Sequence, residues 1–205
     1  MITKTESSGK IDYLACFPKD FNEEKKYPLI IHLHGAGSRY RDAEYTKNQS
    51  IVRYAEQADD FPFVMFLPYC KENTWFDIFE QLKNTVQELV SLPYIDKDKI
   101  FLSGVSMGGY GAWQLLMSLN NVFNKAIICC GGGMYWNADQ IKAQVWAFHG
   151  DKDPIVYPDE SQKMVDAINK HGGTAKLTLY SGVDHNAWDP TYFNPEIYEW
   201  LISDC

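Results

Sequence analysis

The sequence lacks the features that would direct it to a membrane or to a nucleic acid. No apolar run approaches the ~20 residues of a membrane-spanning helix, and the opening stretch MITKTESSGK has no apolar segment of the kind that a signal peptide needs. Basic residues are in the minority, with 19 Lys and Arg against 27 Asp and Glu, and they form no cluster. Because a formal charge of −8 disfavours contact with phosphate backbones and anionic lipids, we expect neither a nucleic acid nor a membrane as a partner.

The cysteines show no recognisable pattern. Adjacent cysteines at 129 and 130 lie in an apolar run, which predicts buried free thiols and a reduced, cytoplasmic protein. The number of cysteines is odd, and none of them has the CxxC spacing of a zinc site. The five are Cys16, Cys70, Cys129, Cys130 and Cys205.

Internal repeats, low-complexity stretches and linkers are absent as well. The 205 residues include 45% hydrophobic and 22% charged residues, which excludes a disordered or fibrous chain. A chain of this length can bury about 70% of its unfolded surface, so we expect one domain over residues 1–205.

Short apolar runs alternate with amphipathic segments along the whole chain. This pattern predicts an α/β fold with a mostly parallel sheet and helices on both faces. The predicted buried strands cover residues 29–33, 63–67, 100–105, 125–130, 145–148 and 177–180, with an antiparallel edge strand at 12–17. The predicted helices cover residues 75–90, a segment after Ser106, 160–170, a last helix capped by Asn194 with Pro195 as its first residue, and a weaker one within 43–58.

A serine stands between the strand at 100–105 and the helix that follows it, in the motif Gly104-Val105-Ser106-Met107-Gly108. A strand that turns directly into a helix forces the serine into a strained conformation. The neighbouring chain then passes close to Gly104 and Gly108, where a Cβ would clash. The motif predicts that Ser106 is a nucleophile, whereas a plain glycine-rich turn is the alternative.

A serine hydroxyl needs a base and an acid, and in this kind of fold they follow the serine in the order acid, then base. His185 follows the strand at 177–180 and is the expected base; a surface-loop histidine is the alternative. Two acids, Asp151 and Asp153, follow the strand at 145–148. Asp153 is preferred because it lies further out, where a loop can aim it at His185, whereas Asp151 is expected to cap the turn. Asp184 is a third, weaker candidate.

Two backbone N–H groups are expected to stabilise the oxyanion of such a reaction. One belongs to Met107, directly after the nucleophile. The other is assigned to Ala36, because His34-Gly35-Ala36-Gly37 brings small residues to the end of the first buried strand. A simple glycine turn is the alternative. A metal is not expected, because no third ligand at a recognised spacing accompanies His32 and His34, and no other cofactor is implied.

These motifs resemble those of the α/β-hydrolase superfamily. The segments PLIIHLHGAGSR, DKDKIFLSGVSMGGYGAW, VWAFHGDKDPIV and GVDHNAWD, in this order, are similar to the small esterase and predicted-peptidase branch related to dienelactone hydrolases and to prolyl oligopeptidase catalytic domains. The resemblance implies serine hydrolysis of an ester or an amide. Dienelactone hydrolases carry cysteine at the position of Ser106, so the resemblance does not extend to their particular activity.

The chain is short for this superfamily, with only residues 131–144 between the fourth and fifth buried strands. No large cap domain fits there, so we expect an open site for a small ester with short acyl or aryl groups. Aromatic residues are candidate walls of this site, although each could instead belong to the core; they are Trp75, Tyr110, Tyr135, Trp136, Trp188 and Tyr40, together with Met134. A serine peptidase for short peptides and a catalytically silent ligand-binding protein are the alternative functions. The sequence predicts no oligomeric state.

Overall fold

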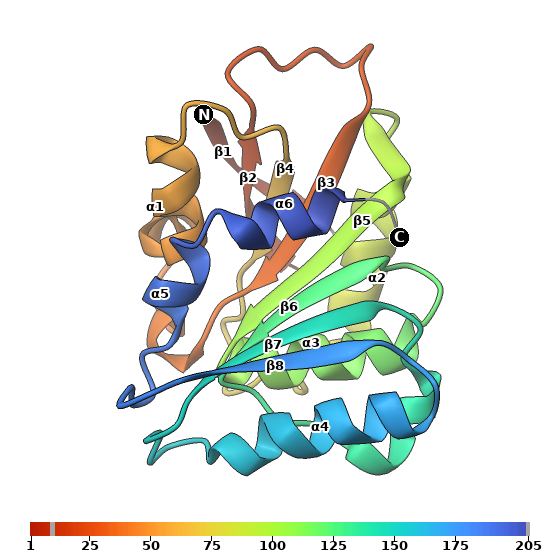
Figure 1. Ribbon diagram of the computed structural model, residues 1–205. Coiled ribbons are helices and arrows are strands. Elements are labelled where there is room, and N and C mark those ends of the chain that lie inside the picture. The colour runs from red at the N-terminus through yellow and green to blue at the C-terminus, as the bar shows by residue number, and fades with distance from the viewer. Residues whose placement is uncertain (9–10, 204–205) are drawn as a thin grey trace.

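The computed structural model describes residues 1–8 and 11–203, in which eight strands form one sheet of order β1-β2-β4-β3-β5-β6-β7-β8 (Figure 1). The six strands from β3 to β8 run parallel to one another, whereas β2 is antiparallel to both β1 and β4. Their bounds are β1 Ile2–Ser8, β2 Ile11–Phe17, β3 Tyr27–Leu33, β4 Val64–Pro68, β5 Ile95–Val105, β6 Lys125–Cys129, β7 Gln144–Gly150 and β8 Ala175–Tyr180.

The strand predicted at 12–17 is antiparallel as expected, but its predicted place at the edge is wrong. β2 lies between β1 and β4, and β1 forms the edge through a register that pairs Ile2 with Phe17. Both faces of β2 are largely buried, which explains its continuous apolar run. β1 carries the polar sequence ITKTESS, which does not show the apolar alternation of a strand.

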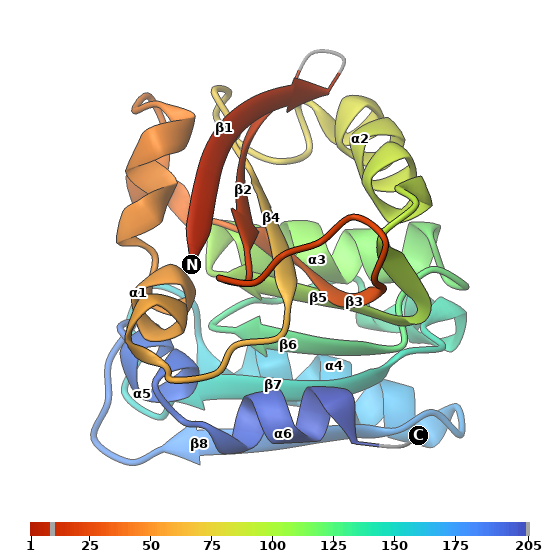
Figure 2. The same cartoon turned by 90° about the horizontal axis from the view of Figure 1, so that it is seen from above.

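Helices cover both faces of the sheet (Figure 2). Alternate side chains of each buried strand enter two separate cores, as the two-residue period of a strand requires. For example, Ile31 belongs to the core beneath α2, α3 and α4, and Ile30 belongs to the core beneath α1, α5 and α6. The helix bounds are α1 Ser50–Gln57, α2 Phe79–Ser91, α3 Met107–Ser118, α4 Pro158–Lys170, α5 Trp188–Tyr192 and α6 Glu196–Ile202.

Helix boundaries differ from the predicted ones where a turn carries apolar residues. Trp75 fits the apolar period of the predicted helix, but the helix begins only at Phe79 because a turn closed by the Asp77 carboxylate precedes it. The weak helix within 43–58 is divided into the 3-10 segment η2 (Ala43–Asn48) and α1. α6 begins at Glu196, one residue later than predicted, and Pro195 rather than Asn194 holds the N-cap position. The Asn194 side chain still accepts a hydrogen bond from the Glu196 N–H.

The connection between β6 and β7 contains only the short 3-10 segment η3 (Tyr135–Gln140), so no cap domain is inserted there. The carboxyl ends of the parallel strands meet at one edge of the sheet, at the left of Figure 1. Sites in such folds form at this edge. Among the described residues, none of the helices has both the length and the apolar character needed to cross a membrane.

Candidate active site

Ser106 sits at the sharp turn between β5 and α3, with backbone angles of φ 52° and ψ −116°. This left-handed conformation is strained for a residue with a side chain. Tight packing around the turn holds it in place, since a Cβ on Gly104 would lie 2.3 Å from the Gly108 carbonyl oxygen and one on Gly108 would lie 2.0 Å from the Leu33 carbonyl oxygen. The glycines therefore stand where the neighbouring chain leaves no room for a side chain.

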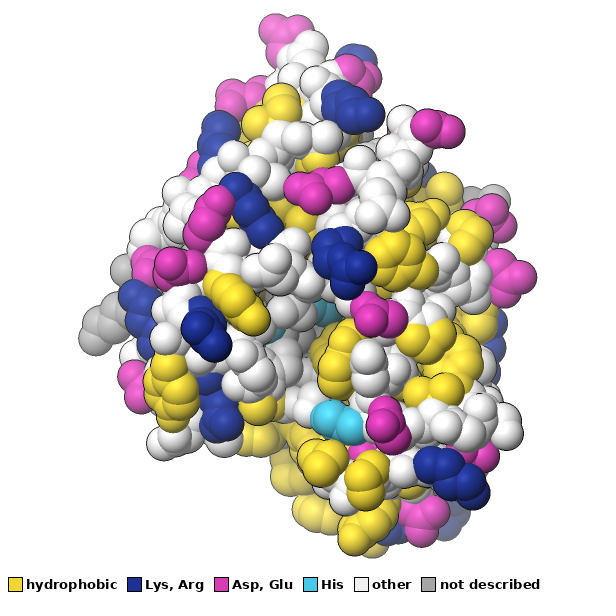
Figure 3. Space-filling view, turned by 90° about the vertical axis from the view of Figure 1, so that its left-hand side faces the viewer, with side chains coloured by type: hydrophobic (Ala, Val, Ile, Leu, Met, Phe, Trp, Pro, Cys, Tyr) yellow, Lys and Arg dark blue, Asp and Glu magenta, His cyan; other side chains and the backbone are white. Residues whose placement is uncertain are grey.

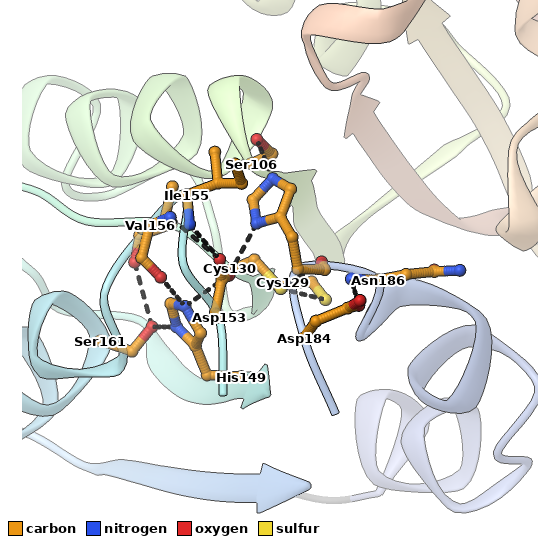
Figure 4. Close-up of polar contacts among 12 residues, drawn as sticks. Ser106, Cys129, Cys130, His149, Asp153, Ile155, Val156, Ser161, Asp184 and Asn186 are labelled. Carbon is orange, nitrogen blue, oxygen red and sulfur yellow. Dashed lines mark hydrogen bonds and ion pairs between the residues drawn. The ribbon is translucent and has the colours of Figure 1, made fainter. Parts of the chain in front are cut away.

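His185 and Asp153 complete a hydrogen-bonded chain that begins at Ser106 (Figure 4). His185 Nε2 lies 2.9 Å from Ser106 Oγ, and His185 Nδ1 lies 2.6 Å from Asp153 Oδ2. The imidazole thus has a carboxylate on one side, which fixes a proton on Nδ1 and leaves Nε2 to accept the serine proton. The three residues come from the ends of β5, β7 and β8, and the structure brings them together as the sequence analysis expects.

Asp153 is buried and accepts four hydrogen bonds. Oδ1 accepts from the backbone N–H groups of Ile155 at 2.9 Å and Val156 at 3.0 Å, whereas Oδ2 lies 2.6 Å from His185 Nδ1 and 3.1 Å from His149 Nε2. Burial alone would raise the pKa of Asp153, but the hydrogen bonds from His185 and the two backbone groups outweigh burial and hold this pKa below its ordinary value. The carboxyl group is therefore ionised at neutral pH.

Asp151, the competing acid, has a different role in the structure. Its Oδ1 accepts a hydrogen bond of 2.7 Å from the backbone N–H of Gly182. The Lys152 N–H donates to the Val183 carbonyl oxygen at 2.9 Å. These two bonds join the loop after β7 to the loop after β8, so Asp151 supports the loop that carries His185 and does not contact its ring. Asp184, the weaker candidate, accepts from the backbone N–H of Asn186.

The two predicted oxyanion donors each begin a helical turn beside Ser106. Met107 is the first residue of α3, and Ala36 is the first residue of the 3-10 segment η1 (Ala36–Ser38). N–H groups at such positions have no acceptor within their own helix, so they are free to bind an anion. The loop is close to the serine, because a Cβ on Gly35 would lie 3.6 Å from the Ser106 Cβ.

A cavity of about 430 Å³ opens beside Ser106 and His185. Figure 3 shows this face of the molecule, which is hollowed near its centre with a histidine side chain at the rim. The Trp188 ring meets the His185 ring edge-on, with centroids 5.5 Å apart. The lining residues are Gly35, Ala36, Gly37, Ser38, Tyr45, Asn48, Gln49, Ser50, Val105, Ser106, Ile155, His185, Trp188 and Tyr192.

Of the predicted aromatic walls, Trp188 lines this cavity, but Trp75, Tyr110 and Tyr40 do not. Trp75 is fully buried in the core, and its Nε1–H donates to the His34 carbonyl oxygen at 3.1 Å. It therefore helps to hold the start of the loop that contains Ala36. Tyr110 lines a separate, smaller cleft of about 200 Å³ along α3. Tyr40 is 68% exposed and donates to Asn73 Oδ1.

The remaining predicted walls also lie away from the serine. Met134 lines the smaller cleft, and Tyr135 and Trp136 are exposed on η3, where their rings meet edge-on. Nearness in sequence could not separate these positions from the cavity, because the segments after β4 and β6 also begin at the carboxyl ends of strands and line a second cleft beside α3.

Sequence reasoning did not identify the segment that forms much of the cavity wall. Residues 38–50, between β3 and α1, contribute Tyr45, Asn48 and Gln49 to the lining. Gln49 Nε2 donates to Ser38 Oγ at 2.8 Å, which fixes the segment against the loop of Ala36. The segment has no motif of its own; its only signal is its place directly after the predicted oxyanion loop.

Among the described residues, Cys130, His149 and Asp153 place possible metal-ligand atoms within 4.8 Å of one another. Each of these atoms already has a protein partner: the Cys130 thiol donates to the His185 carbonyl oxygen, and His149 Nε2 faces Asp153 and the Val156 carbonyl oxygen. The geometry is that of a closed hydrogen-bond network.

Comparison with known proteins gives both esterases and peptidases. The chain is 30% identical to a thermostable esterase of known structure, with a TM-score of 0.83, and the match covers 98% of this chain and 62% of that one. A thermophilic esterase from Thermogutta terrifontis shares the fold at 13% identity and a TM-score of 0.74, covering 98% of this chain and 91% of that chain.

Dipeptidyl-peptidase 5 of Porphyromonas gingivalis is 21% identical over 97% of this chain and 36% of its own length. The chain spans 36% or less of the curated relatives it matches. A model of the dienelactone hydrolase family matches residues 45–191, a range that holds Ser106, Asp153 and His185. These comparisons support a hydrolase, and the extent of the family match shows that the chain belongs to the dienelactone hydrolase family.

Proposed function

We propose that the protein is a serine hydrolase that cleaves short-chain or aryl carboxylic esters through an acyl-enzyme intermediate. The observation that carries the proposal is the unbroken hydrogen-bonded chain from Ser106 Oγ through His185 to Asp153, which opens on a cavity. A strained serine, an oriented imidazole and a buried carboxylate are together the parts that nucleophilic catalysis requires.

In the acylation step, Ser106 Oγ attacks the carbonyl carbon of the ester while its proton moves to His185 Nε2. The imidazolium that forms is stabilised by the ionised Asp153 at 2.6 Å. The carbonyl oxygen gains negative charge, which the N–H groups of Ala36 and Met107 are placed to stabilise. Collapse of the tetrahedral intermediate expels the alcohol, which takes the proton from Nε2 and leaves an acyl group on Ser106.

Deacylation repeats these steps with water in place of serine. His185 Nε2 accepts a proton from a water molecule, whose oxygen attacks the acyl carbonyl carbon. The proton then returns to Ser106 Oγ as the carboxylic acid leaves. Because the side chain of His185 is 19% exposed at the cavity, water has access to Nε2 in the acyl-enzyme.

The cavity favours a small or flat acyl group. Its volume of about 430 Å³ lies at the lower end of the range for small-molecule sites, and the half-buried Trp188 offers an aromatic surface beside His185. A small-molecule ester is therefore the proposed partner.

A serine peptidase is the second candidate, because dipeptidyl peptidases are among the relatives of the chain. The esterase and peptidase functions are distinguished by assaying p-nitrophenyl esters beside peptide p-nitroanilides, with Ser106→Ala as the control for each. We expect ester hydrolysis that Ser106→Ala abolishes. Faster hydrolysis of the anilides would favour the peptidase. Activity on neither substrate, without labelling by a fluorophosphonate, would favour a silent ligand-binding protein.

A further inference from the structure

We propose that His149 is a positioning residue that holds the carboxylate of Asp153 from the side opposite to His185. The inference rests on the proposed function, in which Asp153 is the acid of a Ser-His-Asp triad. His149 is the penultimate residue of β7, is fully buried, and is absent from the lining of the cavity. It therefore cannot touch a substrate there and would act only through Asp153.

The hydrogen-bond partners of His149 determine where its ring carries a proton. Nε2 lies 3.1 Å from Asp153 Oδ2 and 2.9 Å from the Val156 carbonyl oxygen, and both of these atoms are acceptors. Nε2 must therefore be protonated and donate. Nδ1 lies 2.7 Å from Ser161 Oγ, which in turn lies 3.0 Å from the Gly131 carbonyl oxygen. Ser161 thus anchors the other side of the ring (Figure 4).

Two histidines consequently share one carboxylate oxygen. His185 Nδ1 and His149 Nε2 both donate to Asp153 Oδ2, while the backbone N–H groups of residues 155 and 156 occupy Oδ1. A carboxylate has about four acceptor sites, so all of them are used. The bond from His149 fixes the orientation of the carboxylate and draws charge from the oxygen that faces His185. Without it, Asp153 would hold a proton on His185 more strongly.

Other titratable groups near this cluster come from β6, α3 and α4. Glu160 on α4 precedes Ser161 and faces Tyr110, and it is present in every variant compared. The thiols of Cys129 and Cys130 lie at the end of β6, and Tyr110 faces it from α3. Burial raises the pKa of the Cys129 thiol and of the Tyr110 phenol above their ordinary values of 9.0 and 10.0. The Cys130 thiol donates to the His185 carbonyl oxygen. Cys129 and Tyr110 therefore do not change charge in the acidic range where the base of a triad becomes protonated.

The test is the pH dependence of kcat/KM for a p-nitrophenyl ester in His149→Leu, with His149→Gln as the conservative variant. We expect the acidic limb of the His149→Leu profile to move to higher pH by about 0.5 to 1 unit, because a charged hydrogen bond is lost. We also expect kcat to fall ~10-fold at an unchanged KM. His149→Gln, which keeps an N–H donor, should recover part of both effects. Ser161→Ala should move the limb in the same direction by less, and it carries the test if His149→Leu does not fold.

A matched control separates this effect from the loss of any buried imidazole. His32 is equally buried and bonds to Ser103 Oγ at 3.1 Å, not to Asp153. His32→Leu should therefore lower stability and leave the acidic limb in place. An unmoved limb in both His149→Leu and Ser161→Ala, or an equal movement in His32→Leu, would overturn the inference.

Different results would refute the proposed function and the role of His149. A wild-type protein that neither hydrolyses esters nor reacts with a fluorophosphonate at Ser106 would refute the function itself. Wild-type protein that is active and labelled, with variants of unchanged pH profile, would refute only the role of His149.

Discussion

The Asp151 carboxylate accepts the backbone N–H of Gly182 at 2.7 Å, and so spans the two loops that carry Asp153 and His185. Asp151→Asn keeps an oxygen acceptor at this place and should lower kcat/KM only a few-fold. Asp153→Asn removes the charge that stabilises the imidazolium and should lower kcat by about 10²- to 10⁴-fold. Steady-state kinetics of the two variants on one ester checks the ranking, and the reverse order would exchange the roles of the two aspartates.

Ser106 should be the site of covalent modification. Its position at the turn with φ 52° exposes Oγ to the cavity and to His185 Nε2. Mass spectrometry after fluorophosphonate treatment should place one adduct on the peptide that contains Ser106, and Ser106→Ala should not react. Ser103 is the matched control, because it lies on β5 only three residues before Ser106 but is buried and hydrogen-bonded to Tyr192. An adduct on Ser103 or on Ser181 would contradict the assignment.

Removal of the His185 imidazole should lower kcat as much as removal of the Ser106 hydroxyl. We expect His185→Ala to lower kcat by ~10³-fold or more, because the members of a triad act as a unit. The double variant Ser106→Ala/His185→Ala should then be no slower than the slower single variant. Additive losses in the double variant would show that the two side chains act independently, contrary to the hydrogen bond of 2.9 Å between them.

The size of the cavity should set the preferred acyl chain. We expect kcat/KM to peak at acetyl to butyryl or aryl esters and to fall for longer chains, because each additional methylene would gain ~0.8 kcal/mol only if it could be buried. Trp188→Ala should weaken aryl esters more than acetyl esters, since it removes the aromatic surface beside His185. Trp136→Ala, on an exposed ring outside the cavity, is the control. A profile that still rises at decanoyl esters would reveal a longer apolar tunnel.

Two buried histidines should make the fold sensitive to mild acid. Burial lowers the pKa of His32 to about 3 and that of His34 to about 4, from an ordinary value of 6.5. The unfolded chain therefore binds more protons than the folded chain between these values, so the free energy of unfolding falls as the pH drops from about 6.5 towards 4. Each histidine contributes a slope that approaches about 1.4 kcal/mol per pH unit.

Urea denaturation at several pH values between 7 and about 4.5 tests this expectation. His32→Gln should be less stable at pH 7 but should lose less further stability on acidification than the wild type. His171→Gln, at the exposed end of α4, should retain the wild-type slope. Equal slopes in the wild type and His32→Gln would show that the His32 imidazole is not the group that takes up the proton.

Much of this structure could be predicted from the sequence, because the strands and the turn at Ser106 have local sequence patterns. The apolar runs of the parallel strands are continuous, since both faces of the sheet are covered. Glycine stands at 104 and 108 because a Cβ there would lie only 2.3 and 2.0 Å from a carbonyl oxygen. Strand order in an α/β fold puts the ends of β5, β7 and β8 at one edge, so the serine, acid and base could be assigned to one place.

The parts that escaped prediction depend on contacts between distant segments. β1 is polar and becomes a strand only by pairing with β2. Trp75 looks like a wall of the site in sequence, but α3 packs so closely over it that a Cβ on Gly111 would lie 3.0 Å from its side chain. The bond between His149 and Asp153 has the i, i+4 spacing of a helix, yet it forms across a loop, where spacing alone predicts nothing.

The cavity wall supplied by residues 38–50 has a consequence for how such an enzyme can diversify. Ser106, Asp153 and His185 follow the ends of β5, β7 and β8, whereas residues 38–50 are one continuous segment that ends at the first residue of α1. Part of the acyl selectivity is thus expected to be encoded in a stretch of the gene separate from these three residues. An exchange of residues 38–50 with the matching segment of a homologue should transfer that part of the acyl preference in a single recombination event and leave Ala36, Ser106 and His185 unchanged.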